Sequence, residues 1–247
     1  MRSIQIILFA LISFSGCNKN INNAMPIITD TLKTVKRGPV DTLTYLALGD
    51  SYTIGEAVSQ NNSFPYQLTF LLNSDFQYNS IPFGVSNPRI IATTGWTTDN
   101  LIDAINISNV IGKKYSFVTL LIGVNDEFQN KSQANYQVKF EQVLKTAISL
   151  AGDDVSKVFV LSIPDYGVTP FAAGQDNIIG PKIDQFNAIN MAISNKLGVH
   201  YLNITEISRQ AAANPALVAP DGLHPSALMY KMWMQQLEPI VAGEYKK

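Results

Sequence analysis

Short apolar runs alternate with longer amphipathic segments along the chain from Thr44 onward. This alternation is typical of strands and helices that build a parallel sheet with helices on both faces. A strand covered on both faces is mostly apolar along its length, and five runs fit this description. The predicted strands are Tyr45–Leu48, Arg89–Ala92, Phe117–Ile122, Val158–Ile163 and Val199–Asn203. With 247 residues in the chain, the pattern predicts one α/β domain.

Three of the segments between these runs carry apolar residues at three- and four-residue spacing, which predicts helices with one buried face. The clearest runs from Tyr136 to Leu150, and its predicted core-facing stripe includes Val138. A second covers about Lys182–Leu197, and a third begins near Ser226. We interpret the methionine and aromatic residues of these stripes as core rather than as ligand contacts.

The N-terminal segment follows a different pattern. An apolar stretch from Ile4 to Phe14 follows Arg2, and it is too short to span a bilayer but suits the core of a signal peptide. Gly16 precedes Cys17, the only cysteine of the sequence, and this resembles the cleavage and lipidation box of bacterial lipoproteins. We predict a lipoprotein signal peptide over residues 1–17 with Cys17 lipidated; the alternative is an ordinary signal peptide with an incidental cysteine.

Residues 18–42 are polar, show no sustained apolar period and contain Pro26, Gly38 and Pro39. This composition predicts a flexible tether, followed by the folded domain at residues 43–247. The protein is thus expected to be exported and held on a membrane of the bacterial cell envelope by its N-terminal lipid. Lys and Arg total 18 and Asp and Glu total 19, and no basic run is present, so nucleic acid is not an expected partner.

Ser51 follows the first predicted strand, and Asp221 and His224 lie near the other end of the chain. A serine hydroxyl needs a base within hydrogen-bond reach and a third group that orients the base. The chain has two histidines; His200 lies in the last predicted strand and is interpreted as structural, whereas His224 lies in a loop beside Pro225. Ser51, His224 and Asp221 are therefore the candidate catalytic triad.

Two more segments follow predicted strands. Gly95 comes after the second strand, and Gly123-Val124-Asn125-Asp126 comes directly after the third. In open α/β sheets ligands bind at the carboxyl ends of the strands, so both segments are expected near Ser51. A glycine at position 95 lets the backbone approach a substrate without a Cβ in the way.

These segments together resemble the blocks of the SGNH hydrolases, also called the GDSL esterase/lipase family. The matching blocks, in the family's order, are Gly49-Asp50-Ser51, the turn at Gly95, Gly123-x-Asn125-Asp126 and Asp221-x-x-His224. The resemblance covers about Thr44 to Val241 and implies a flavodoxin-like three-layer α/β/α sandwich with a five-stranded parallel sheet. Tyr52 stands where the family name implies leucine.

The resemblance implies a role for each matching residue. Ser51 would be the nucleophile, His224 the general base and then acid, and Asp221 the carboxylate that orients His224. The backbone N–H groups of Ser51 and Gly95 and the side-chain amide of Asn125 would bind the oxyanion, with a neighbour of Gly95 as the alternative second donor. The reaction implied needs no metal and no cofactor.

Other residues near these blocks are given structural or lining roles. Asp50 and Asp126 are expected to cap turns or helix N-termini, because short carboxylates beside such turns commonly do so. Aromatic residues of the loops are candidates for the wall of the cleft, and packing of the loops onto the sheet is the alternative for them. These aromatic residues are Tyr52, Trp96, Tyr166 and Phe171.

The expected activity is a carboxylic-ester hydrolase that acts through an acyl-serine and removes a short acyl group, such as acetyl, from a carbohydrate or similar small ester. The protein is expected to act as a monomer. A lysophospholipase or lipase on the same triad is the nearest alternative. Two alternatives of other classes are a non-catalytic binding lipoprotein and a metal-dependent phosphoesterase, for which the ligands would be Asp50, Asp126, Asp221 and His224.

Overall fold

Five parallel strands form the central sheet, in the order β4-β2-β5-β6-β7. The computed structural model describes residues 42–77 and 83–246, so the predicted signal peptide with Cys17, and the predicted tether up to residue 41, lie outside the described residues. The strands are β2 (Tyr45–Gly49), β4 (Arg89–Ala92), β5 (Phe117–Leu121), β6 (Val158–Leu161) and β7 (His200–Leu202). Each lies within two residues of its predicted bounds.

The register places one row of residues across the whole sheet. Ala47 of β2 pairs with a residue on each neighbouring strand, and the row continues to the edge at β7. The row consists of Ile90, Ala47, Thr119, Phe159 and His200. His200 stacks on the Phe159 ring, with centroids 4.9 Å apart, and its Nε2 lies 3.2 Å from a carboxylate oxygen of Glu244. This placement agrees with the structural role predicted for His200.

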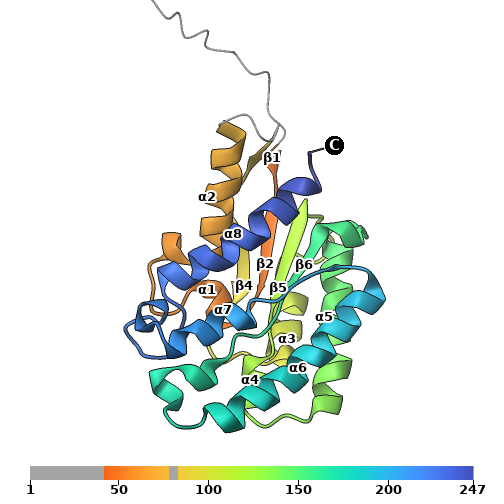
Figure 1. Ribbon diagram of the computed structural model, residues 1–247. Helices are drawn as coiled ribbons and strands as arrows, with labels where there is room; N and C mark the ends of the chain where they lie inside the picture. The colour runs from red at the N-terminus through yellow and green to blue at the C-terminus, as the bar shows by residue number, and fades with distance from the viewer. Residues whose placement is uncertain (1–41, 78–82, 247) are drawn as a thin grey trace, which may run out of the picture. The chain divides into compact units, whose positions relative to one another are not determined.

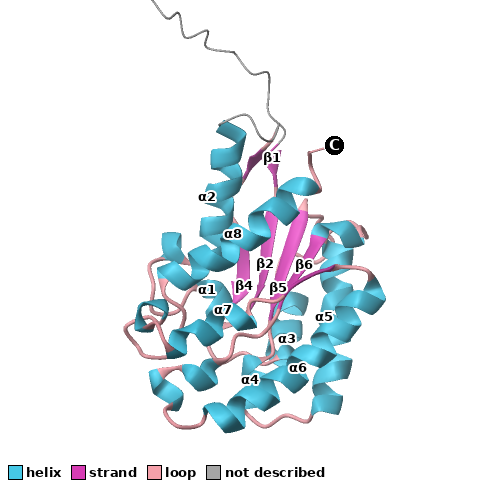
Figure 2. Cartoon of the chain, viewed as in Figure 1, coloured by secondary structure: helices cyan, strands magenta, loops and turns pink. Residues whose placement is uncertain are grey.

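Helices cover both faces of the sheet (Figures 1 and 2). On one face α2 (Phe64–Gln77) packs against α8 (Ala227–Gly243). On the other, α5 (Gln133–Leu150) contacts both α3 (Thr98–Ile107) and α6 (Asp176–Leu197). This is the three-layer α/β/α sandwich with a five-stranded parallel sheet that the resemblance implied. Among the described residues, no helix combines the length and the apolar character that a bilayer span requires.

Shorter elements lie in the segments that connect these strands and helices. The single-turn helices are α1 (Ser51–Ile54), α4 (Val124–Phe128) and α7 (Thr205–Arg209). A separate two-stranded parallel piece, β1 (Thr42–Leu43) with β3 (Gly84–Val85), was not predicted. Two residues per strand are too few for a period to be recognised.

The helix bounds and one inward residue differ from the prediction. Helix α5 begins three residues early, because Ser132 caps it by accepting the Asn135 N–H. Helix α6 begins six residues early and includes Pro181, which lacks an N–H and is disfavoured inside helices. Val138 was predicted to face the core but is 65% exposed. Two residues turn a helix by about 200°, so Val138 lies opposite the buried Phe140.

Candidate active site

Ser51 lies where β2 ends and the chain turns through Asp50 into α1. The Asp50 carboxylate caps this helix by accepting the Tyr52 N–H at 3.0 Å, and the Asp50 carbonyl accepts the N–H groups of Thr53 and Ile54. The first N–H groups of a helix have no partner within the helix. In α1, the N–H groups of Tyr52, Thr53 and Ile54 have these acceptors, and the Ser51 N–H has none in the described part of the chain. Ser51 therefore presents both its hydroxyl and its N–H.

Close packing behind Ser51 explains the glycine of the first block. A Cβ on Gly49 would overlap the Thr53 side chain and the Leu121 carbonyl of the neighbouring strand β5. A glycine at this position thus lets α1 sit directly against the end of the sheet. The Asp50 side chain is buried in the same place, and its capping bond agrees with the structural role predicted for it.

His224 and Asp221 share one loop immediately before α8. His224 Nδ1 lies 2.5 Å from Asp221 Oδ2, and the other carboxylate oxygen accepts the backbone N–H groups of Leu223 and His224, each at 3.0 Å. Partial burial of Asp221 acts to raise its pKa, but these three hydrogen bonds outweigh burial and hold the pKa below its ordinary value. An ionised carboxylate only accepts, so Nδ1 carries the hydrogen and Nε2 is left as the base.

Ser51 and His224 line the same cavity of about 250 Å³, at the carboxyl end of the sheet. The residues around it come from the segments that follow β2, β4, β5 and β6 and from the His224 loop. They are Ser51, Tyr52, Thr94, Gly95, Val124, Asn125, Phe128, Tyr166, Phe171, Leu223 and His224. The hydrogen bonds of the described residues do not include one between Ser51 Oγ and His224 Nε2, a contact that often tightens only when substrate binds.

Asn125 and Gly95 face this cavity from α4 and from the loop after β4. Asn125 donates one amide hydrogen to the Trp96 carbonyl at 3.0 Å, which leaves its second amide hydrogen for another acceptor. Gly95 has φ 81°, and a Cβ built there would meet no atom within 4 Å. Within the protein, the glycine at 95 is thus explained by the left-handed backbone rather than by crowding.

The carboxylates of Asp50 and Asp126 are next to the candidate residues Ser51 and Asn125 in the sequence. Asp126 Oδ2 accepts the N–H and the hydroxyl of Thr98, at 2.8 and 2.9 Å, and so caps the start of α3. Burial raises the pKa of Asp50 to about 8, and it also raises the pKa of Asp126.

Within residues 42–77 and 83–246, no group of three or more His, Cys, Asp or Glu side chains could hold a metal ion. The structure therefore does not assemble the four ligands that the phosphoesterase alternative requires.

Aromatic rings form the outer wall of the cavity. Phe128 lies with its ring centroid 6.0 Å from that of Tyr166 and 6.3 Å from that of Phe171. Phe128 and Phe171 are 53% and 55% exposed. The Tyr166 hydroxyl donates to the buried Glu127 at 2.7 Å, and the Phe171 N–H donates to the Gly222 carbonyl of the His224 loop at 2.9 Å. The cavity wall is therefore apolar but tied to the catalytic loops by polar contacts.

The predicted lining residues are confirmed in part. Tyr52, Tyr166 and Phe171 line the cavity, whereas Trp96 does not and instead packs partly buried against the core. Phe128 was missed, although it follows the Gly-x-Asn-Asp block by two residues and its single-turn helix could have placed it beside Asn125.

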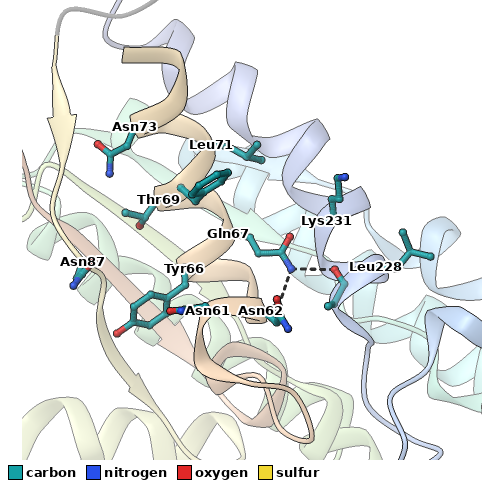
Figure 3. A pocket seen from close by; sticks show the side chains of 12 residues that line it. Asn61, Asn62, Tyr66, Gln67, Thr69, Leu71, Asn73, Asn87, Leu228 and Lys231 are labelled. Carbon is teal, nitrogen blue, oxygen red and sulfur yellow. Dashed lines mark hydrogen bonds between the residues drawn. The ribbon is translucent and has the colours of Figure 1, made fainter. Parts of the chain in front are cut away.

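A larger open hollow of about 800 Å³ lies over α2 and the start of α8 (Figure 3). Uncharged amides such as Asn61 and Asn62 line much of it, together with the exposed Lys231. Gln67 crosses between the two helices by donating to the carbonyls of Asn62 and Ala227, at 2.7 and 3.0 Å. No histidine, serine or carboxylate is among the residues that line this hollow, so the candidate chemistry lies in the smaller cavity.

The model of the GDSL-like lipase/acylhydrolase family matches residues 47–232 of the chain. This interval contains Ser51, Gly95, Asn125, Asp221 and His224. No curated protein matches the sequence.

Solved structures share the fold at low sequence identity. A protein described as a GDSL-like lipase, from Parabacteroides merdae, has a TM-score of 0.64 and 15% identity, covering 83% of this chain and 99% of its own. The acetylxylan esterase Axe2 from Geobacillus stearothermophilus has a TM-score of 0.61 and 15% identity, with coverages of 81% and 94%. The psychrotrophic esterase EstA from Pseudoalteromonas sp. has a TM-score of 0.60 and 14% identity, with coverages of 83% and 100%.

Proposed function

The chain belongs to the GDSL-like lipase/acylhydrolase family and is an ester hydrolase, and on this basis we propose that Ser51, His224 and Asp221 are its catalytic triad. The observation that carries the proposal is the single cavity that Ser51 and His224 both line, with His224 bonded to Asp221 at 2.5 Å. A nucleophile beside a base that is oriented by a carboxylate is the arrangement that acyl transfer requires.

In the proposed reaction, Ser51 Oγ attacks the ester carbonyl carbon while its proton passes to His224 Nε2. The negative charge that develops on the carbonyl oxygen is bound by the N–H groups of Ser51 and Gly95 and by the Asn125 amide. The C–O bond to the alcohol then breaks, and His224 gives its proton to the departing oxygen. A water molecule, deprotonated by His224, attacks the acyl-serine, and collapse of the second tetrahedral intermediate returns the proton to Ser51.

We propose a short acyl group, such as acetyl, on a carbohydrate or similar small ester as the substrate. The cavity of about 250 Å³ supports this, because ligand pockets commonly measure about 300–1,000 Å³ and a long chain would need more room. The residues that line it include no carboxylate, lysine or arginine, so a neutral acyl group fits. An acetylxylan esterase is among the proteins that share the fold.

A lysophospholipase or lipase is the second candidate. The half-exposed rings of Phe128 and Phe171 favour it, because apolar surface at the rim would hold an acyl chain that extends beyond the cavity. Hydrolysis that rises with acyl length would support this candidate over the short-acyl esterase.

The test compares hydrolysis of p-nitrophenyl acetate, butyrate and octanoate by the chain without residues 1–17 and by its Ser51→Ala and His224→Ala variants, with and without EDTA. We expect turnover that is unaffected by EDTA, is greatest with acetate and disappears in both variants. Turnover that persists in Ser51→Ala would contradict the proposed triad. Turnover that EDTA abolishes would favour the metal-dependent alternative instead.

We also propose that the protein is exported and held on a membrane of the cell envelope through a lipid on Cys17, and that it acts as a monomer. The support is the apolar stretch before Cys17 and the small residues beside it. Membrane fractionation of the full chain and of Cys17→Ser tests the anchor, since the variant should leave the membrane fraction. Size-exclusion chromatography with light scattering tests the monomer.

A further inference from the structure

The loop of residues 93–97, which carries Gly95 between β4 and α3, has little to hold it from within. The one backbone–backbone hydrogen bond between its own residues, in a segment that the structure describes completely, runs from the Trp96 N–H to the Thr93 carbonyl at 3.3 Å. Gly95 is exposed, and the space around it is open. Glycine has two soft torsions and no side chain that packing could lock, so contacts from outside the loop decide where its N–H points.

Thr97, at the end of the loop, is held by Asn100 of α3, to which it donates its N–H and its hydroxyl. At Gly95 and Trp96 the contacts come from α4 and the residue after it. Asn125 Nδ2 donates to the Trp96 carbonyl at 3.0 Å, and Gln129 Nε2 donates to the Gly95 carbonyl at 3.1 Å. On the other side of Gly95, the Thr94 hydroxyl donates to a Glu56 carboxylate oxygen at 2.5 Å. Gln129 is therefore the side chain that bonds to Gly95 itself.

The position of these bonds along the backbone matters for the Gly95 N–H. That N–H belongs to the peptide between Thr94 and Gly95, and this peptide lies between the Thr94–Glu56 bond and the Gly95–Gln129 bond. Turning the N–H away from the cavity requires rotation about bonds that these two contacts restrain. The Gln129 side chain is not among the residues that line the cavity, and its hydrogen bond to Gly95 is what links it to the site.

We propose that Gln129 is a positioning residue that holds Gly95 so that its N–H donates to the oxyanion. The proposal rests on the proposed function, in which Gly95 supplies the second backbone donor. Loss of a whole oxyanion donor typically lowers turnover by about 100- to 1,000-fold. Loss of Gln129 leaves the donor in place but free to turn away, so a smaller effect follows.

The test is the pair Gln129→Glu and Gln129→Lys, assayed on p-nitrophenyl acetate. Glutamate keeps the size of the side chain but replaces the amide donor with an oxygen that repels the Gly95 carbonyl. We expect kcat to fall about tenfold and KM to stay within about twofold, because the oxyanion forms only in the transition state. Lysine restores a donor within reach of the carbonyl and should recover most of the lost kcat, which a purely structural role would not predict.

Gln133→Ala is the matched control, because Gln133 is another exposed glutamine whose amide donates to a side chain, that of Gln185. It should keep the parent kcat. If Gln129→Glu also keeps the parent kcat, or raises KM alone, the positioning role is wrong. If Ser51→Ala remains active, the proposed triad fails instead. Should Gln129→Glu melt at a lower temperature than the parent, Gln129→Ala repeats the test without the added charge.

Discussion

Asp221 binds both the ring and the backbone of His224: one carboxylate oxygen lies 2.5 Å from Nδ1, and the other accepts the His224 N–H at 3.0 Å. The turn that brings the ring to the carboxylate is thus built by the same carboxylate. This arrangement needs only four consecutive residues, and the residue after them, Pro225, forms a bridge with Val218 that ties the loop down. The orientation of the base is therefore local, whereas its meeting with Ser51 is a property of the whole fold.

Asp221→Asn separates these two tasks of the carboxylate. The asparagine oxygen can still accept the backbone N–H groups of Leu223 and His224, but the amide now presents a donor to the ring and favours the wrong tautomer. We expect kcat for p-nitrophenyl acetate to fall by about 1,000- to 10,000-fold, with little change in the melting temperature. Unchanged kcat, with the fold intact, would show that His224 does not depend on Asp221.

Asn125→Ala removes the side-chain donor of the proposed oxyanion hole. We expect kcat to fall by about 100- to 1,000-fold, with a smaller change in KM, because the interaction strengthens as charge develops on the substrate oxygen. Steady-state kinetics with p-nitrophenyl acetate provide the measurement. An effect on KM alone would instead assign Asn125 to ground-state binding.

Phe128→Ala and Phe171→Ala test the aromatic rim of the cavity. Each should lower kcat/KM for p-nitrophenyl octanoate more than for the acetate, because a buried methylene contributes about 0.8 kcal/mol and the acetyl group does not reach the rim. Phe70→Ala is the matched control: Phe70 is 70% exposed but lines the separate hollow over α2. If a rim variant lowers kcat/KM equally for both esters, as a folding defect would, this role is wrong.

We expect the buried Asp50 to make the stability of the protein depend on pH. Its pKa is raised to about 8 in the folded protein, against an ordinary value of 3.8, so between these values the native state holds a proton that the unfolded chain has lost. The free energy of unfolding should then fall as pH rises from about 4 to about 8, by up to about 1.4 kcal/mol per pH unit from this group. Urea denaturation of the parent and of Asp50→Asn at several pH values measures this.

Asparagine at position 50 can keep the capping bond to the Tyr52 N–H while removing the titration. The variant should therefore show a flatter dependence of stability on pH than the parent does. An equal slope in the two proteins would mean that Asp50 does not hold the proton.

The strands and the sequence motifs that follow them could be predicted because each depends on signals inside one segment. Mostly apolar runs predicted all five strands of the sheet. The polar residues directly after several of them lie at its carboxyl end, as predicted. The Val138 error is also local, because its two-residue spacing from Phe140 already places the two side chains on opposite sides of a helix.

Other parts that were missed depend on segments that meet only in the folded chain. Gln129 and Gly95 are 34 positions apart, and neither residue carries a sign of the other. The same holds for the bond between Glu127 and Tyr166, which fixes a wall of the cavity. For the same reason the sequence left two positions open for Trp96, the wall of the cleft or packing onto the sheet, and only the folded loop shows that it packs against the core.

Ser51 follows the first strand of the central sheet, and His224 precedes α8, the last helix described. During synthesis, the proposed nucleophile therefore emerges long before the proposed base. We expect that α8 must form and pack against α2 before Ser51 and His224 can line one cavity. The proposed esterase activity should thus return during refolding only after segments from both ends of the folded domain have come together around the cavity.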